Sequence, residues 1–184
     1  MKKKTAMIAT KTIAYSAMLT AISVVLARLI IPMPNEFTRF SIEAVPIFLA
    51  GMFFGPVVGG CVGFAADLVG CLFSAYGYNP IYCVPPVLYG ICGGILYCMR
   101  KREAGLVSIG IAFAVPVIAG SILYQSWALG MMMGKGFVYF LSTRSIQFAI
   151  TYVLDVAIVY FLIKSRIFHR MGLLSTRKDK EHDD

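Results

Sequence analysis

Arginine, carboxylate, amide and aromatic side chains gather at the expected outer ends of long apolar segments. Arginine binds carboxylates and other anions through paired N–H donors, and tyrosine and tryptophan offer flat faces to an aromatic ring. An aspartate can accept hydrogen bonds from paired N–H groups of a heterocycle. A small, planar, anionic molecule would use all three features. The residues expected to bind it are Arg28, Arg39, Asp67, Tyr78, Asn79, Gln125, Trp127, Arg144 and Gln147.

Each of these residue types also has a structural interpretation. Aromatic residues collect at membrane interfaces, arginines extend toward lipid headgroups, and Asp67 could pair with an arginine to hold helices together. Asp155 is a further ionisable residue, near the middle of the last apolar segment, and the sequence defines no role for it.

The composition places these residues in an integral membrane protein. Hydrophobic residues make up 59% of the 184 residues, charged residues only 14%, and the mean hydropathy is +0.78. Several apolar runs exceed the roughly 18–20 residues needed to cross the hydrocarbon core. The net charge of +8 does not indicate nucleic-acid binding, because most basic residues lie at the ends of the apolar runs, where topology explains them.

Three basic clusters determine the expected topology. They lie before the first apolar run (2–11), between two later runs (100–102) and after the last (164–180). The positive-inside rule places all three in the cytoplasm, so an even number of spans separates each pair. We therefore expect an all-α integral membrane protein with six transmembrane helices and cytoplasmic N and C termini. Its expected parts are a six-helix substrate-binding domain over 1–170 and a polar cytoplasmic tail over 171–184. The expected spans are approximately 12–31, 41–54, 56–74, 80–99, 106–131 and 143–163.

Glycine and proline mark helix breaks and close helix contacts. Phe54-Gly55-Pro56 divides residues 41–74 into two short spans, and Val84-Pro85-Pro86 is expected to interrupt the fourth span. The proline pair either frees backbone carbonyls for a protein, water or ligand partner or forms a simple packing kink. Glycines at GxxxG spacing between positions 55 and 63, and again at 90 and 94, predict close packing of helices. Ala17 and Ala21 form a similar small-residue step on the first span.

Catalytic chemistry is not expected from this sequence. Both histidines, His169 and His182, follow the last span, so no histidine-based metal or catalytic set is expected inside the membrane. The sequence contains no HExxH, GxSxG or P-loop motif. We therefore expect no enzyme, no ATP hydrolysis by this chain itself and no cofactor.

Two long segments resemble a known family. RFSIEAVPIFLAGMFFGP (39–56) and GFAADLVGCLFSAYGYNPIYCVPPVLYG (63–90) are similar to the folate-specific substrate-binding (S) component of energy-coupling factor (ECF) vitamin transporters. The resemblance implies a six-helix protein that binds a vitamin at the outer face of the cell membrane. It also implies association with a transmembrane coupling protein and two cytoplasmic ATPases, with Ala17 and Ala21 at the contact. The S component is then expected to topple in the membrane and release its vitamin inside.

Folate suits the predicted site, because a pterin ring can stack and hydrogen-bond while a glutamate tail meets arginine. Two alternatives remain open. The chain could be the S component for another vitamin, such as pantothenate or a queuosine precursor, or a small membrane scaffold without a transport role.

Overall fold

The computed structural model describes the backbone of residues 2–28, 31–32, 39–40, 42–73, 80–98, 105–133 and 137–165. A π-helix, η1, joins α5 and α6 into one continuous rod, so the described residues form six helical rods and one two-residue antiparallel ribbon. This confirms the expected all-α architecture of six helices. The elements are α1 (Lys2–Arg28), β1 (Ile31–Pro32), β2 (Arg39–Phe40), α2 (Ala44–Phe54), α3 (Pro56–Leu72), α4 (Pro80–Cys98), α5 (Leu106–Pro116), η1 (Val117–Tyr124), α6 (Gln125–Met133) and α7 (Phe137–Lys164).

The distribution of polarity is inverted relative to a water-soluble protein. Large apolar side chains such as Val57, Leu72 and Val107 are exposed, whereas the polar side chains of Arg144 and Asp155 are buried. A lipid surrounding accounts for this pattern, because apolar side chains that face hydrocarbon carry no penalty and polar groups must be satisfied inside.

Three described helices are long and apolar enough to cross a membrane on their own. They are Thr10–Arg28, Leu106–Met131 and Gln147–Lys164. The apolar segments of α2, α3 and α4 are shorter, so these three helices are expected to depend on one another for their place in the bilayer.

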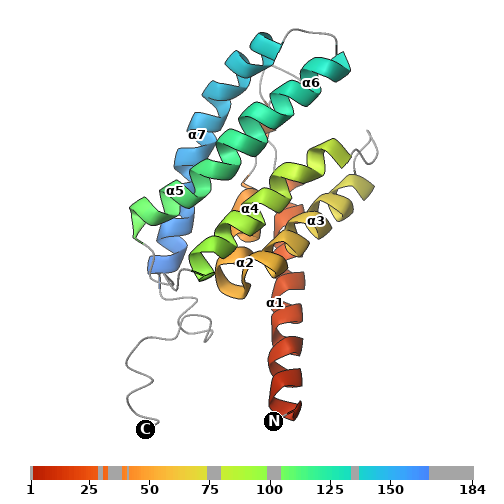
Figure 1. Cartoon of the computed structure of the whole chain (residues 1–184), viewed down its shortest axis with the longest axis vertical. Helices are drawn as coiled ribbons and strands as arrows, with labels where there is room; N and C mark the ends of the chain where they lie inside the picture. Colours follow the sequence, from red (N-terminus) through yellow and green to blue (C-terminus); the bar gives the residue numbers. More distant parts are fainter. Residues whose placement is uncertain are drawn as a thin grey trace.

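The start of the first helix and the end of the last helix lie on one side of the bundle. α4, the α5–η1–α6 rod and α7 run alongside one another, and α1 and α3 lie to their side (Figure 1). The first turn of α1 and the last turn of α7 point to the same end of the molecule (Figure 1), as an even number of crossings requires. We call the opposite end the far end. Its assignment to the outside of the cell stays a prediction.

The break between α2 and α3 lies at the predicted position. Gly55 has φ 96° and ψ 171°, a conformation that strongly favours glycine, and Pro56 occupies the first turn of α3. However, α2 has only 11 residues and covers about 16 Å, roughly half of the hydrocarbon core. The expected second span, 41–54, is therefore a half-span. The first span also ends earlier than expected, because Ile31 and Pro32 pair with β2.

The expected interruption at Val84-Pro85-Pro86 was wrong, because α4 continues from Pro80 to Cys98 with both prolines inside it. The π-helix packs against this point. A β-carbon on Gly120 would lie 3.3 Å from Cα of Pro85, which shows how closely η1 approaches. The proline pair is thus a packing site between α4 and η1.

Glycines bring the backbones of α2, α3 and α4 into direct contact, which confirms the prediction from GxxxG spacing. A β-carbon on Gly59 would collide with the carbonyl oxygen of Gly90, and one on Gly90 would collide with that of Gly59. Gly51 and Gly63 meet the α4 backbone in the same way. Since no side chain separates them, these three helices form one closely packed unit.

Aromatic rings connect this unit to the remaining helices. Phe48 of α2 and Phe113 of α5 are completely buried, with ring centroids 4.9 Å apart. Phe113 also contacts Tyr89 of α4 at 5.1 Å and Tyr152 of α7 at 6.4 Å. The core therefore lies where α2, α4, α5 and α7 meet.

Candidate ligand-binding site

Arg144, in the second turn of α7, is the central charged group of the far end. Its side chain is only 8% exposed, its Nη2 donates to Oε1 of Gln125 at 2.8 Å, and the guanidinium lies 5.3 Å from the ring centroid of Phe148. Its Nε and Nη1 are buried and make no hydrogen bond within the part of the chain that the structure describes. A buried polar group left unbonded costs about 1–3 kcal/mol, and more when charged, so this guanidinium is suited to an acceptor supplied by a ligand.

Further polar side chains on three helices lie at the same end of the molecule as this guanidinium. Gln147 lies one turn along α7 and is buried, and Tyr82 on α4 is within electrostatic range of Arg144. Ser126, next to Gln125 on α6, is completely buried, and its Oγ makes no hydrogen bond. The structure thus brings together Gln125, Arg144 and Gln147, three of the residues expected from the sequence.

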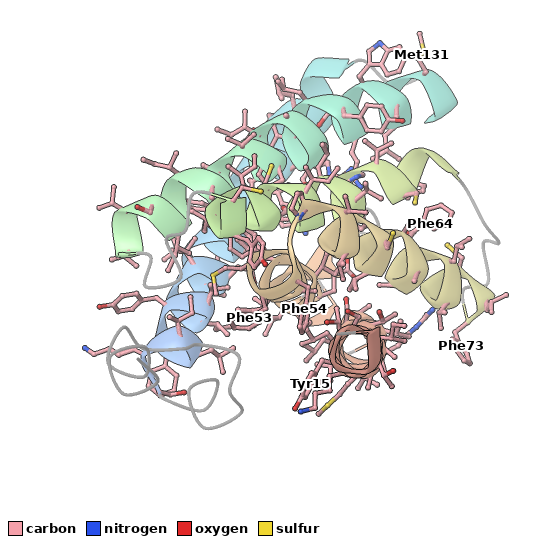
Figure 2. The ribbon with its side chains drawn as sticks, turned by 60° about the horizontal axis from the view of Figure 1, so that its bottom comes forward. Tyr15, Phe53, Phe54, Phe64, Phe73 and Met131 are labelled. Atoms are coloured by element: carbon pink, nitrogen blue, oxygen red, sulfur yellow. The ribbon has the colours of Figure 1, made fainter. Side chains whose placement is uncertain are left out.

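Arg28 has a different setting, although it lies at the same end of the molecule. It is the last residue of α1, its side chain is exposed, and it donates to the carbonyl oxygen of Gly70 on α3. Its guanidinium also lies 6.0 Å from the ring centroid of Phe73, a side chain at the periphery of the bundle (Figure 2). Arg28 therefore joins the ends of α1 and α3 at the rim.

Asp67 lies one turn before Gly70 on α3 and is half-buried. Its carboxylate accepts a hydrogen bond from the thiol of Cys83 on α4, and its Oδ2 is buried without a hydrogen bond to the described residues. Asp67 is thus close to the rim formed by Arg28. Its partner Cys83 directly follows Tyr82, the α4 residue that lies within electrostatic range of Arg144.

Trp127 is not part of the group around Arg144. Its side chain is 53% exposed, and its ring lies 6.5 Å from that of Tyr124 at an angle of 41°. The neighbouring Ser126 is completely buried, so the tryptophan lies on an exposed face of α6. This placement fits the interfacial aromatic belt that was the structural interpretation of this residue.

The other residues expected to bind the ligand lie on the β-ribbon or outside the described residues. Arg39 belongs to β2, where its backbone pairs with Pro32. Tyr78, Asn79 and the tail 171–184 lie outside the described residues.

A second polar group lies at mid-depth around Asp155, the residue for which the sequence defined no role. Asp155 of α7 is 2% exposed, lies within electrostatic range of Glu43, and is also close to Tyr89. The Tyr89 hydroxyl and Oγ of Ser121 in η1 are 3.1 Å apart. The spacing of polar residues along α7 was a signal for Asp155, but nothing in the sequence links Tyr89 to Ser121.

One apolar groove lies apart from these polar groups. It has a volume of about 520 Å³, runs between α3 and α4, and is lined only by apolar side chains, among them Val57, Phe64 and Ile91. These three side chains are exposed, so the groove faces the lipid and belongs to neither polar group.

Ala17 and Ala21 lie on an uncovered part of α1. Both are exposed, while Tyr15 stacks on Phe54 of α2 with ring centroids 6.4 Å apart and an interplanar angle of 12°. Figure 2 shows Tyr15 beside Phe53 and Phe54. The small-residue step is therefore available for contact with another membrane protein.

Fold, polar interior and exposed small-residue step together define a membrane-embedded binding protein. The family model for the substrate-specific component of ECF transporters matches residues 11–165, and the chain belongs to this family. It is accordingly a multi-pass membrane protein and a transporter component.

Individual relatives have known ligands. The chain is 23% identical to the folate transporter FolT of Clostridium novyi (strain NT) over 147 residues. The aligned region covers 79% of this chain and 84% of that protein. A crystal structure of FolT bound with folic acid aligns with a TM-score of 0.70 and 30% identity, over 84% of this chain and 93% of that one. The S component for biotin from an ECF-type ABC transporter, at 20% identity, shares the fold with a TM-score of 0.65, over 84% of this chain and 92% of that one.

Proposed function

We propose that this chain is the high-affinity folate-binding subunit of an ECF-type vitamin importer, and that it captures folate at the outer face. The observation that carries the proposal is the buried guanidinium of Arg144, which has two unbonded donors at one end of a fold shared with a folic acid complex. The glutamate part of folate supplies the anionic oxygens that such a guanidinium binds most strongly.

The nine residues expected from the sequence are proposed as contacts of unequal depth. Arg144, Gln125 and Gln147 form the buried part of the site. Arg28, whose side chain is exposed, is proposed at the rim of the site, and Trp127 is proposed only as a peripheral contact at the same end. The far-end location of all five supports entry of the ligand from that side. Contacts are also proposed for Arg39, Asp67, Tyr78 and Asn79.

Calorimetric titration of folic acid into the detergent-purified protein tests the ligand. We expect saturable one-to-one binding without any partner subunit, because the polar groups belong to this chain alone. If folic acid gives no heat but pantothenate or a queuosine precursor binds, folate is the wrong ligand and the chain is still a transporter subunit. No binding across such a panel by folded protein would favour the scaffold alternative.

We further propose that a transmembrane coupling protein docks on the exposed step at Ala17 and Ala21, and that two cytoplasmic ATPases supply the energy. The termini are then cytoplasmic. Replacing both alanines by tryptophan should abolish co-purification with the coupling protein, because the bulky rings prevent close helix approach. Folic acid affinity should stay within about twofold, since neither alanine is among the proposed folate contacts.

A matched control for this double variant is available on α5. Val107 and Ile111 have the same four-residue spacing and are also exposed, so replacing both by tryptophan adds equal bulk to a different face. This control should retain the coupling protein. Retention by the Ala17→Trp/Ala21→Trp variant, or loss by the control, would place the interface elsewhere.

A further inference from the structure

The rod formed by α5, η1 and α6 carries two stripes of side chains that repeat every four residues. Every fourth residue from 107 to 131 is exposed, and every fourth residue from 109 to 129 is buried or half-buried. Both stripes continue through η1 without changing sides. We call the buried set the inner stripe, and its members are Ile109, Phe113, Val117, Ser121, Gln125 and Leu129.

A regular α-helix cannot keep such stripes on one side. It turns about 100° per residue, so four residues exceed a full turn by about 40°. This excess accumulates along the rod, and an uninterrupted α-helix would place Gln125 roughly 160° around the axis from Ile109. Gln125 would then lie on the exposed side of the rod. Its observed place on the inner stripe therefore requires wider turns between α5 and α6.

The π-helix η1 supplies these wider turns. In a π-helix each N–H bonds to the carbonyl five residues earlier, and the N–H of Gln125 donates to the carbonyl oxygen of Gly120 in this way. The middle of η1 is held against α4. A β-carbon on Gly120 would lie 3.2 Å from Cδ1 of Leu88, and the hydroxyl of Ser121 is hydrogen-bonded to that of Tyr89. Since α6 continues directly from η1, the turns of η1 set the rotation of α6.

We propose that η1 is a positioning element of the folate site, because its wide turns bring Gln125 to Arg144. Oε1 of Gln125 accepts the hydrogen bond from Nη2 of Arg144 at 2.8 Å, which holds the guanidinium in one orientation. This inference rests on the proposed function, in which both residues bind folate. The site then depends on the number of residues in η1, which determines which side chain of α6 faces Arg144.

An alanine inserted between Ile118 and Ala119 tests this dependence. It should turn α6 by about 100° relative to α5, so that Tyr124 takes the place of Gln125 opposite Arg144. Folic acid affinity should fall about 10-fold or more, as expected for a lost hydrogen bond to a charged group. Adding Tyr124→Gln to the insertion returns a glutamine to that place and should recover most of the loss. Tyr124→Gln without the insertion should not raise the affinity.

Two single-residue deletions give an independent test if the insertion variant does not fold. Ile118 is exposed and lies in η1. Its deletion lets η1 close into an α-helix while Gln125 stays within roughly 60° of the inner stripe, so folic acid affinity should stay within about fivefold. Ile111 is also exposed but lies in the regular helix α5. Its deletion should abolish binding and lower the melting temperature, because it turns the buried Ile109 out of the core.

Calorimetric titration of folic acid into each detergent-purified variant gives the result. Wild-type protein must first bind folic acid, and its failure to do so would overturn the proposed function itself. Unchanged affinity in the insertion variant, or no recovery when Tyr124→Gln is added, would overturn the inference and leave folate binding intact. Loss of binding by folded protein that lacks Ile118 would overturn it as well, because the π-helical geometry itself would then be required.

Discussion

The two halves of this membrane protein use opposite packing chemistry. In the glycine-packed half, formed by α2, α3 and α4, backbones touch because Gly51, Gly59 and Gly90 leave no room for a side chain. In the polar half, formed by α5, η1, α6 and α7, the interior holds Arg144 and Asp155 with unbonded polar atoms. The glycine-packed half gains stability from close backbone contact. The polar half retains buried unbonded groups that cost stability and that the proposed folate binding would satisfy.

The irregular helix lies in the polar half as well. η1 spans eight residues directly after Pro116, and π-helical turns occur frequently at functional sites. A proline removes one hydrogen-bond donor from the helix, which favours a change of hydrogen-bond register at this point. The comparison indicates that α2, α3 and α4 form one closely packed unit, and that the irregular helix and most of the buried polar groups belong to the other helices.

Gly90→Ala should produce the largest effect on folding, because it breaks the glycine-packed half. The added β-carbon would meet only backbone atoms of Gly59 and Gly60, which cannot turn aside as a side chain can. Overpacking costs about 1–3 kcal/mol, and contact with backbone atoms alone puts this variant near the upper end, at about 3 kcal/mol. The apparent melting temperature in detergent should fall by about 6–12 °C.

Gly70→Ala is the matched control in the same half. No atom lies within 4 Å of a β-carbon placed on Gly70, and alanine favours a helix over glycine by up to about 1 kcal/mol. Its melting temperature should therefore equal or exceed that of the wild type. A similar fall in both variants would show that the close backbone contact is not what stabilises these helices.

Arg144→Ala and Arg28→Ala compare two arginines at the same end of the molecule. Arg144 is buried with two unbonded donors, whereas Arg28 is exposed and bonded to a backbone carbonyl. Losing a charge-assisted contact in a buried setting should weaken folic acid about 100-fold, and loss of the rim arginine about fivefold or less. Titration with folic acid and with 6-hydroxymethylpterin, which has no glutamate, measures both.

The loss in Arg144→Ala should be much smaller for the pterin than for folic acid. Equal factors for the two ligands would mean that Arg144 does not meet the glutamate part. A larger loss of folic acid affinity in Arg28→Ala than in Arg144→Ala would show that Arg28, and not Arg144, is the main contact of the glutamate. The melting temperature without ligand shows whether a variant has lost affinity through unfolding.

Much of the fold could be predicted from the sequence, since apolar length and basic clusters are local properties of the chain. The six helices, the break at Gly55 and the GxxxG contacts were all found this way. The shortness of α2 was not predicted, because an apolar composition does not show how far a helix extends across the membrane. The continuity of α4 through Pro85 and Pro86 was missed because neighbouring packing decides whether a proline breaks a helix.

The sequence predicted which residue types form the site and at which end of the molecule they lie. It did not predict the direction in which each side chain points. Gln125, Arg144 and Gln147 were expected at one end of the molecule and lie there together. Trp127 points outward because helix rotation is set by packing, which the sequence does not display. The link between Tyr89 and Ser121 depends on contact between helices distant in sequence, so it emerged only from the structure.

The hydrogen bond between the two halves should have the smallest of these effects. Tyr89 of α4 and Ser121 of η1 are both buried, with their hydroxyl oxygens 3.1 Å apart. Tyr89→Phe and Ser121→Ala should each cost about 1 kcal/mol, or about 2–4 °C in melting temperature. The double variant should cost less than the sum, because removing both partners leaves neither hydroxyl unbonded. Strictly additive losses would show that the two hydroxyls do not interact, and that the aromatic core alone holds the halves together.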